Sequence, residues 1–327
     1  MYSKQDTEYI LQIKSLTKHF PVPGGFMQRP KGWIQAVDHV DLQLPRGRTL
    51  GLVGESGCGK STLAKLILRL LDPDQGSILF QGQEIALMPE RRLKHLRKSL
   101  QIVFQDPYGS LNPKLSIGRT LEDGLRVAGL DKKKRPARIK ELLQLVGLPS
   151  GARQGYAHQF SGGQRQRINL ARALSVEPQL IVCDEPVSAL DVSIQAQIIN
   201  LLSELQMELG LSYLFISHDL NLVGYLSDQV AVMYMGQIVE YAPSREIFQN
   251  PRHPYTQTLL AAVPGREPQE LTQLQSISGE VPALMDPPPG CRFQARCAQA
   301  GEICKNEGPG LRSLGPGHLV RCVRTSA

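Results

Sequence analysis

The chain has 327 residues, of which 41% are hydrophobic and 20% are charged, and its formal net charge at pH 7 is +7. This length allows one large α/β domain and a smaller appendage. There is no run of about 18 apolar residues, and residues 1–6 lack an apolar stretch, which argues against a membrane-spanning helix and a signal peptide. We therefore expect a protein that folds and stays in the cytosol and touches a membrane only through partners.

The first part of the chain has the pattern of strands followed by one helix. Residues 9–16 and 37–44 alternate between apolar and polar side chains, which predicts two strands separated by a loop rich in proline and glycine. Residues 49–53 form a short, buried strand. A helix is predicted next, ending before Asp72. Its apolar face consists of Leu63, Leu66, Ile67, Leu70 and Leu71.

The middle of the chain predicts a helical region and then a parallel sheet. Residues from 107 to about 175 are mostly helical, and one helix carries an apolar stripe. That stripe consists of Ile139, Leu142, Leu143 and Val146, and Gly147 closes it. Strands and helices then alternate, which is typical of parallel strands joined by crossover helices. The strands are predicted at 180–184, 211–217 and 230–234, and the helices at 193–209 and 219–226.

The positive net charge alone would permit binding to nucleic acid or to anionic lipid. The densest basic cluster, Lys132 to Arg135, lies just before an amphipathic helix. No aromatic side chains alternate with these charges, as a stacking surface for bases requires. We interpret the cluster as a solvated helix end and predict no nucleic-acid partner.

Nine residues between the strand at 49–53 and the following helix contain the pattern G-x-x-x-x-G-K-S. They are Gly54, Glu55, Ser56, Gly57, Cys58, Gly59, Lys60, Ser61 and Thr62. In such a loop the backbone N–H groups bind phosphate at the start of a helix, and glycine allows the phosphate oxygens to come close. Lys60 would bridge the β- and γ-phosphates, and the Ser61 hydroxyl would bind Mg²⁺. A glycine-rich turn with an incidental lysine does not explain the full pattern.

Two acidic residues, Asp184 and Glu185, follow the buried strand at the carboxyl edge of the predicted sheet. Asp184 is placed to hold Mg²⁺ through water, and Glu185 to polarise the attacking water. Phosphoryl transfer depends on such positioning and on charge neutralisation. A simple strand-end cap is the alternative, but it does not explain why Lys60, Ser61 and His218 also follow strands at the same edge.

A second helix start suited to an anion occurs in a chain that has only one phosphate loop. Ser161, Gly162, Gly163 and Gln164 precede an arginine-rich helix. Ser161 is well placed to be the N-cap of that helix, whose dipole favours a negative charge.

Six elements therefore occur in one order: the phosphate loop, Gln105, Ser161–Gln164, the strand ending in Asp184-Glu185, Ser188–Asp191, and Ser217–Asp219. In this ordered set the chain resembles the ATP-binding subunit of an ABC transporter. The resemblance implies an α/β fold of the P-loop ABC ATPase type. Such a fold has a RecA-like parallel sheet, an antiparallel β subdomain and a helical subdomain. It also implies ATP hydrolysis with Mg²⁺.

The resemblance assigns roles within one nucleotide site. Gln105 would contact Mg²⁺ and water, and His218 would contact the γ-phosphate and orient Glu185. Phe20 stands where the family usually has an aromatic residue stacked on adenine. That residue is more often tyrosine, but stacking needs only a π-face, and Trp33 is the rival candidate.

The resemblance also implies a second subunit. The Ser161–Gln164 segment and Asp191 would close over ATP held by another subunit, head to tail. Phe104–Pro113, Asn250–Thr256 and Pro287–Cys291 look like the oligopeptide/dipeptide/nickel importer family, closest to its subunit lettered F. In that family two different ATPase subunits pair beneath two permease subunits, which a substrate-binding protein supplies.

The resemblance covers about residues 10–325. It implies that the chain powers import of dipeptides or oligopeptides across the inner membrane and lies peripherally at the cytoplasmic face of that membrane. Glutathione and nickel stay open as substrates. A soluble ABC ATPase of DNA repair or translation is the competing class. The segment between Lys60 and Ser161 has no heptad run of the repair type, and the chain has one cassette rather than two. A non-hydrolysing subunit conflicts with the presence of Glu185 and His218.

We predict a nucleotide-binding domain at 8–245, with its helical subdomain at about 107–175, and an oligopeptide-transporter-type C-terminal region at 246–327. That region contains four cysteines in a segment rich in proline and glycine: Cys291, Cys297, Cys304 and Cys322. A cytosolic chain seldom keeps disulfides, and a segment without a core suggests a metal staple.

The spacing of these cysteines lacks the C-x₂-C pairs typical of zinc. Similar tails in the importer family hold a 4Fe–4S cluster, which four thiolates suit. We therefore predict a small cysteine-rich extension with an iron–sulfur cluster, and keep zinc or unliganded thiols as alternatives. Cys58 and Cys183 lie outside this motif.

Overall fold

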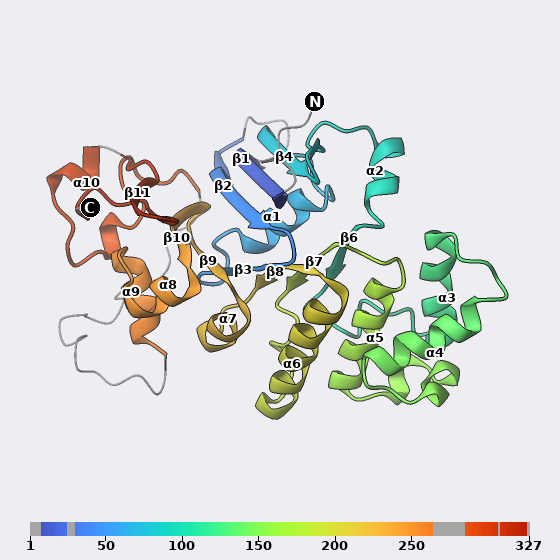
Figure 1. Cartoon of the computed structure of the whole chain (residues 1–327). Helices are drawn as coiled ribbons and strands as arrows, with labels where there is room; N and C mark the ends of the chain where they lie inside the picture. Colours follow the sequence, from blue (N-terminus) through green and yellow to red (C-terminus); the bar gives the residue numbers. More distant parts are fainter. Residues whose placement is uncertain (1–7, 25–29, 264–284, 307, 326–327) are drawn as a thin grey trace. The chain divides into compact units, whose positions relative to one another are not determined.

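The computed structural model describes residues 8–24, 30–263, 285–306 and 308–325 (Figure 1). The chain forms two compact units. The first consists of residues 1–44, 50–86 and 217–327, and the second of residues 45–49 and 87–216. The first unit is therefore assembled from both ends of the chain, whereas the second is nearly continuous.

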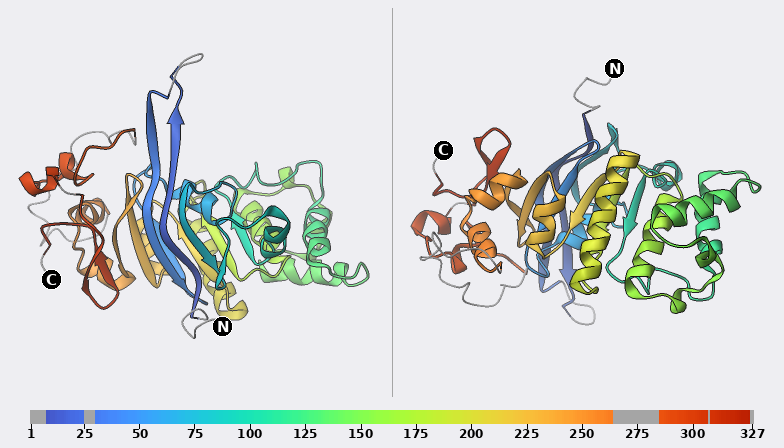
Figure 2. Two further views of the ribbon diagram at one scale, coloured as in Figure 1. Left: turned by 90° about the horizontal axis from the view of Figure 1, so that it is seen from above. Right: turned by 60° about the horizontal axis from the view of Figure 1, so that its bottom comes forward.

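The first unit contains an antiparallel sheet of four strands in the order β2-β1-β4-β5. These are β1 (Tyr9–Val22), β2 (Gly32–Pro45), β4 (Gln75–Phe80) and β5 (Gln83–Glu84). In β2 the side chains of Val40, Leu42 and Leu44 are buried and those between them are exposed, which confirms the predicted period of two. Figure 2 shows β1 and β2 as long neighbouring strands. Both run beyond the predicted bounds, and the Lys31 N–H donates to the Val22 carbonyl at 3.0 Å.

The first unit also contains the strand that leads into the phosphate loop. This strand, β3 (Thr49–Val53), is parallel to β9 (Gln229–Tyr234). The strands β9, β10 (Gln237–Pro243), β12 (His318–Val320) and β11 (Arg312–Gly315) then pair antiparallel in that order. This part of the sheet is therefore mixed, and its last two strands come from the C-terminal end. The other helices of the unit, besides the one after the phosphate loop, are α7 (Leu220–Leu226), α8 (Ser244–Gln249), α9 (Pro254–Ala261), η5 (Gln294–Arg296) and α10 (Glu302–Asn306).

Helix α1 (Lys60–Ile67) follows the phosphate loop and is shorter than predicted. Arg69 has a left-handed φ of 52°. Its N–H donates to the Leu66 carbonyl at 2.9 Å, and the Leu70 N–H donates at 2.8 Å to the carbonyl five residues earlier. These bonds form a Schellman motif, which ends a helix. Leu70 is 52% exposed, so the prediction that Leu70 and Leu71 belong to the buried helix face was wrong.

A buried carboxylate joins three segments in the C-terminal half of the first unit. Glu240 in β10 has no exposed surface. Its carboxylate accepts hydrogen bonds from the N–H groups of Arg252 at 2.7 Å and His253 at 2.9 Å. The Nε2 atom of His318 in β12 lies 2.8 Å from Glu240 Oε1. These bonds hold the start of α9 and the strand β12 against β10, and they satisfy the buried carboxylate without solvent.

Replacing Glu240 with alanine should destabilise the first unit, because two backbone N–H groups and a histidine lose their acceptor in the interior. Unpaired buried donors cost about 1–3 kcal/mol each, so we expect the free energy of unfolding to fall by at least about 2 kcal/mol. Urea denaturation followed by circular dichroism measures the change. Glu302→Ala is the control, since Glu302 is exposed and forms a surface pair with Lys305. Equal losses of stability in the two variants would contradict the prediction.

The second unit has a parallel sheet of three strands in the order β8-β7-β6. The strands are β6 (Leu100–Val103), β7 (Leu180–Asp184) and β8 (Ser212–Ile216). In the pairing register, Val103 lies opposite Cys183 and Asp184 lies opposite Ile216, so the strands end at one edge. Helix α6 (Val192–Leu209) is the crossover between β7 and β8. These bounds confirm the predicted strands and the crossover helix.

The segment from 107 to about 175 of the second unit is mostly helical, as predicted, and one further helix, α2 (Glu90–Leu96), was not predicted. Helix α2 precedes β6, and α3 (Ile117–Ala128), α4 (Arg135–Leu145) and α5 (Gly162–Leu174) pack on one another (Figure 1). The short turns η2 (Ser150–Gln154) and η3 (Ala157–Gln159) lie between α4 and α5. The predicted stripe of Ile139, Leu142, Leu143 and Val146 is buried. Within the described ranges, no helix combines the length and the apolar character needed to cross a membrane.

Candidate functional site

The phosphate-loop residues 54–62 connect β3 to α1 in the first unit. The backbone of this loop requires glycine at two positions. Gly59 has a φ of 112°, and a Cβ atom there would lie 2.1 Å from the Ala36 carbonyl oxygen. Gly54 has a φ of 155°, and its Cβ atom would lie 2.2 Å from the Met233 carbonyl oxygen. A side chain at either position would push the loop away from the strands beside it, so the loop's conformation depends on both glycines.

Lys60 lies inside this loop. Its side chain is buried, and its Nζ atom donates to the carbonyl oxygens of Gly54 at 2.7 Å and Glu55 at 2.9 Å. Helix α1 begins at Lys60 without a side-chain cap at Gly59, so the first N–H groups of the helix carry the partial positive charge of a helix start. An ammonium group and a helix N-terminus therefore lie on the same loop, an arrangement that can bind phosphate. Ser61 is exposed at this helix start.

Two residues of the C-terminal region contact the second residue of the phosphate loop. The Glu55 N–H donates to the Tyr255 hydroxyl oxygen at 2.9 Å. The Arg296 guanidinium donates to both carboxylate oxygens of Glu55, at 2.7 and 2.9 Å. Sequence reasoning missed both contacts. Tyr255 lies in the segment Asn250–Thr256 that resembles the importer family, but the resemblance assigned it no role, and Arg296 lies in no motif. The two residues are 200 and 241 positions from Glu55.

His218 also belongs to the first unit, in the turn that leads into α7. Asp219 is the N-cap of α7, and its carboxylate accepts hydrogen bonds from the N–H groups of Asn221 and Leu222. The Asp219 N–H in turn donates to the Ser217 hydroxyl at 3.0 Å. The Ser217 N–H donates to the carbonyl of Leu52, in the strand before the phosphate loop, at 3.3 Å. This turn keeps His218 exposed and ties its neighbour to the strand that carries the phosphate loop.

The two candidates for adenine stacking lie on the β1–β2 hairpin. Phe20 is half-buried near the end of β1, and the Lys18 ammonium lies 5.6 Å from the centre of its ring. Trp33 is 48% exposed near the start of β2. Both rings keep an accessible surface, so each remains a candidate.

In the second unit, Asp184 is the last residue of β7 and Glu185 follows it. Glu185 has a left-handed φ of 48°. Its N–H donates to the Ile216 carbonyl at 3.0 Å, and its carbonyl accepts from the Ser188 hydroxyl at 3.2 Å. A non-glycine residue in this conformation costs about 1–3 kcal/mol and is often found at functional sites. Other non-glycine residues of the described chain share this conformation. The conformation is therefore consistent with a functional role for Glu185 but does not establish that role by itself.

Gln105 lies in an exposed loop two residues beyond the end of β6. The loop is shaped by Asp106, whose carboxylate accepts a hydrogen bond from the Tyr108 N–H at 2.8 Å. Because β6 and β7 are parallel neighbours, Gln105 follows β6 at the same edge of the sheet where Asp184 ends β7. The structure thus places an amide and two carboxylates, those of Asp184 and Glu185, at one edge.

The segment Ser161–Gln164 starts α5 in the second unit. Ser161 is the N-cap, as predicted. Its hydroxyl accepts from the Gln164 N–H at 3.3 Å, and the Gln164 side chain accepts from the Ser161 N–H at 3.0 Å, which completes a capping box. Both side chains are exposed. Asp191 is likewise exposed and is the N-cap residue of α6, where its carbonyl accepts from the Ile194 N–H at 2.9 Å.

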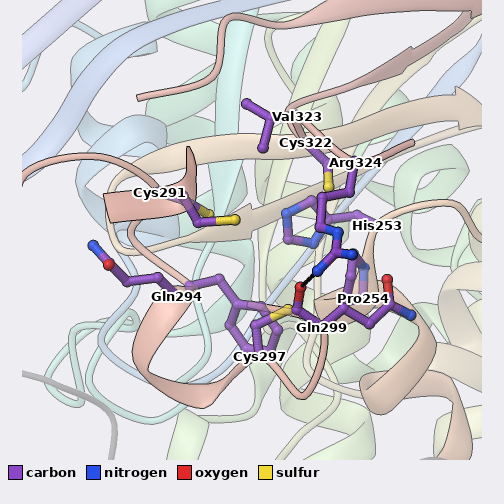
Figure 3. Close-up of a pocket in the computed structure, with 11 residues that line it drawn as sticks. His253, Pro254, Cys291, Gln294, Cys297, Gln299, Cys322, Val323 and Arg324 are labelled. Carbon is purple, nitrogen blue, oxygen red and sulfur yellow. Dashed lines mark hydrogen bonds between the residues drawn. The ribbon is translucent and has the colours of Figure 1, made fainter. Parts of the chain in front are cut away.

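The four C-terminal cysteines line one small pocket, beside His253. Figure 3 shows Cys291, Cys297 and Cys322 around it. All four are free thiols, and burial raises the pKa of Cys291 and Cys297, which favours the neutral thiol. The enclosed space measures about 20 Å³, room for about one water molecule.

The iron–sulfur prediction is therefore wrong for this structure. Across residues 8–24, 30–263, 285–306 and 308–325, no group of three or more His, Cys, Asp and Glu side chains is arranged to hold a metal ion. The arrangement of these side chains therefore supports neither an iron–sulfur cluster nor zinc. The separate cysteine-rich extension is not supported for a physical reason. Phe293 and Val320 are buried, and β12 pairs with β10, so the tail shares a core and needs no staple.

The cysteines outside the tail are packing residues. Cys58 and Cys183 are both buried, and burial raises the pKa of each thiol. The raised pKa favours the neutral thiol at both positions.

Comparisons with known proteins agree with this arrangement. The family described as "ABC transporter" matches residues 37–188, and the family described as "Oligopeptide/dipeptide transporter, C-terminal region" matches residues 239–304. The oligopeptide transport ATP-binding protein AppF of Bacillus subtilis is 47% identical over 96% of this chain and 97% of its own length. The dipeptide transport ATP-binding protein DppF of Escherichia coli is 47% identical over 96% of this chain and 93% of its own length.

A solved structure supports the same fold. The dimeric ATP-binding cassette MJ0796, bound to ADP and phosphate in a post-hydrolysis state, superposes with a TM-score of 0.61. It is 26% identical, and the match covers 72% of this chain and 99% of that one.

The mixed and parallel strands, the phosphate loop and the acidic strand end define a phosphate-loop ATPase of the ABC type. The relatives AppF and DppF are 47% identical to this chain and align over nearly its whole length, which identifies the family within the ABC ATPases. The chain belongs to the ATP-binding proteins of oligopeptide and dipeptide ABC transporters, and its relatives include subunits lettered F, AppF and DppF.

Proposed function

We propose that this chain is the ATP-binding and ATP-hydrolysing subunit that powers peptide import by an ABC transporter. The observation that carries the proposal is the 47% identity to AppF over 97% of that protein. The names of AppF and DppF favour oligopeptides and dipeptides over glutathione or nickel. The soluble ATPases of repair and translation lose their support, because the C-terminal match is to a transporter family.

ATP would bind with its phosphates in the loop 54–62. The backbone N–H groups and Lys60 would hold the β- and γ-phosphates, and Phe20 or Trp33 would stack on adenine. Ser61, Gln105 and Asp184 would hold Mg²⁺, which neutralises phosphate charge when bound.

Within hydrolysis, Glu185 would accept a proton from the attacking water and so orient it towards the γ-phosphate. His218 would contact the γ-phosphate and keep Glu185 in position. The backbone strain at Glu185 supports this assignment, since a fixed conformation aims the carboxylate without further ordering.

We further propose that the chain works in a pair of ATP-binding subunits beneath two permeases. The exposed side chains of Ser161 and Gln164 at the start of α5 and the exposed Asp191 support a surface that covers ATP on the other subunit. The dimeric state of MJ0796 supports a paired arrangement. A substrate-binding protein would deliver the peptide, and the chain would sit peripherally at the cytoplasmic face of the membrane. In this proposal residues 8–245 are the nucleotide-binding domain, with a helical subdomain at about 107–175, and 246–327 are its C-terminal region.

The purified chain alone should hydrolyse ATP slowly and should accelerate when the second ATP-binding subunit and the permeases are added. The reason is that its own ATP lacks a signature segment from the proper partner. Phosphate release measures both rates, with Lys60→Ala in the complex as the control for turnover at this chain's own site. If the chain alone hydrolyses ATP at the rate of the full complex, the proposal of a paired subunit is wrong. If peptide does not stimulate the complex in liposomes with its binding protein, the proposed substrate class is wrong.

A further inference from the structure

The C-terminal region contacts the phosphate loop through an ion pair of Arg296 with Glu55. The guanidinium nitrogens lie 2.7 and 2.9 Å from the two carboxylate oxygens, so the pair is bidentate. The Arg296 side chain is 7% exposed and that of Glu55 is 22% exposed. A bidentate pair that is largely withdrawn from solvent is stronger and more specific in geometry than a surface ion pair.

Arg296 is held in place from behind by aromatic rings. Its guanidinium lies 5.8 Å from the centre of the Tyr234 ring. The rings of Tyr234, Tyr255 and Phe293 pack together, with centres 4.6 to 5.4 Å apart. Tyr255 is fully buried, and the His253 Nδ1 atom accepts a hydrogen bond from its N–H at 3.0 Å. The Arg296 guanidinium that binds Glu55 is therefore held in place by packed aromatic side chains.

The position of Glu55 gives the ion pair an electrostatic consequence. Glu55 stands inside the loop proposed to bind a triphosphate, and its carbonyl also accepts from Lys60. A carboxylate at that place repels a polyanion unless a cation neutralises it. Arg296, near the C-terminal end of the chain, supplies this cation. The Tyr255 hydroxyl also binds Glu55, because it accepts a hydrogen bond from the Glu55 N–H.

We propose that Arg296 is a positioning residue for nucleotide, which neutralises Glu55 and fixes the phosphate loop, with Tyr255 as the second contact. The inference rests on the proposed binding of ATP to this loop. It assigns to the C-terminal region a direct part in setting nucleotide affinity. The C-terminal region and the phosphate loop are thereby coupled through one carboxylate.

The test is a double-mutant cycle on the full-length chain, with MgATP affinity measured by calorimetry. Arg296→Ala should weaken MgATP binding by about tenfold, as expected when one like charge near the phosphates is no longer neutralised. Adding Glu55→Gln to Arg296→Ala removes that charge, so the double variant should bind MgATP more tightly than Arg296→Ala alone. The weakening in Arg296→Ala should also shrink as salt is raised, because salt screens the repulsion. Arg312→Ala removes the same charge from an exposed arginine that bonds to Thr325, and it should leave affinity unchanged.

Each outcome bears on the inference. Unchanged affinity in Arg296→Ala overturns it, and so does a double variant as weak as the single one, since loss of packing alone would produce that result. If Arg296→Ala does not fold, Arg296→Lys keeps the charge without the bidentate geometry and should weaken binding less than Arg296→Gln. Equal weakening in these two variants would overturn the inference. Absence of MgATP binding in the wild-type chain would instead overturn the proposed function.

Discussion

Replacing Glu185 with glutamine should leave MgATP binding intact and slow hydrolysis by at least about 100-fold, the usual cost of losing a positioned general base. The amide keeps the size of the side chain but cannot accept the proton of the attacking water. The variant should therefore collect in a closed, ATP-bound assembly of the two ATP-binding subunits. Single-turnover hydrolysis in the reconstituted complex measures the rate, and size-exclusion chromatography with MgATP measures the assembly.

Glu204→Gln is the matched control, because Glu204 is exposed on α6 of the same unit. It should hydrolyse ATP at the wild-type rate. Turnover near the wild-type rate in Glu185→Gln would remove Glu185 from the role of base, whatever its backbone conformation.

Replacing Ser161 with arginine should abolish most hydrolysis and transport by the complex while the chain still binds ATP in its own loop. The long cation would stand at the exposed start of α5 and block the ATP site of the opposite subunit. Loss of the N-cap by itself costs only about 1 kcal/mol, which is too little to explain a block. ATP hydrolysis by the complex, peptide uptake into liposomes, and nucleotide binding by the isolated chain measure the three quantities.

Ser116→Arg separates the block from the loss of a cap. Ser116 is the N-cap of α3, and its hydroxyl accepts from the Arg119 N–H at 3.3 Å. This variant loses the same kind of cap on another helix and should keep hydrolysis. Comparable loss of activity in both variants would show that Ser161 acts through helix stability alone.

Local patterns allowed the strands of the sheet centre and several helices to be predicted, because each depends on residues close in the sequence. The strands β4, β5, β10, β11 and β12 were not predicted. Strand 180–184 and the stripe from Ile139 to Val146 are examples, since period and burial agree there. Helix α1 shows the limit. Its apolar residues continue past Ile67, but the chain turns at Arg69 through a left-handed conformation that more often takes glycine.

The candidate site divides in the same way. The phosphate loop could be predicted because its glycines and lysine are consecutive and their steric need is local. Tyr255 and Arg296 could not, because their contact with Glu55 exists only after distant segments of the first unit have folded together. The four tail cysteines were predicted to meet, and they do line one pocket. Spacing could not reveal that the described side chains are not arranged to hold a metal ion.

The first unit is assembled from segments at both ends of the chain, which affects the order of folding during synthesis. The second unit consists of residues 45–49 and 87–216, so a growing chain contains all of its residues well before synthesis ends. The phosphate loop is among the earlier segments to emerge, yet its partner Arg296 is 241 positions later than Glu55. Pairing segments so distant requires closure of a very long loop, which makes it a late event in folding. During translation the second unit can therefore fold before the phosphate loop has its contacts with Tyr255 and Arg296. Those contacts form only when synthesis of the chain is nearly complete.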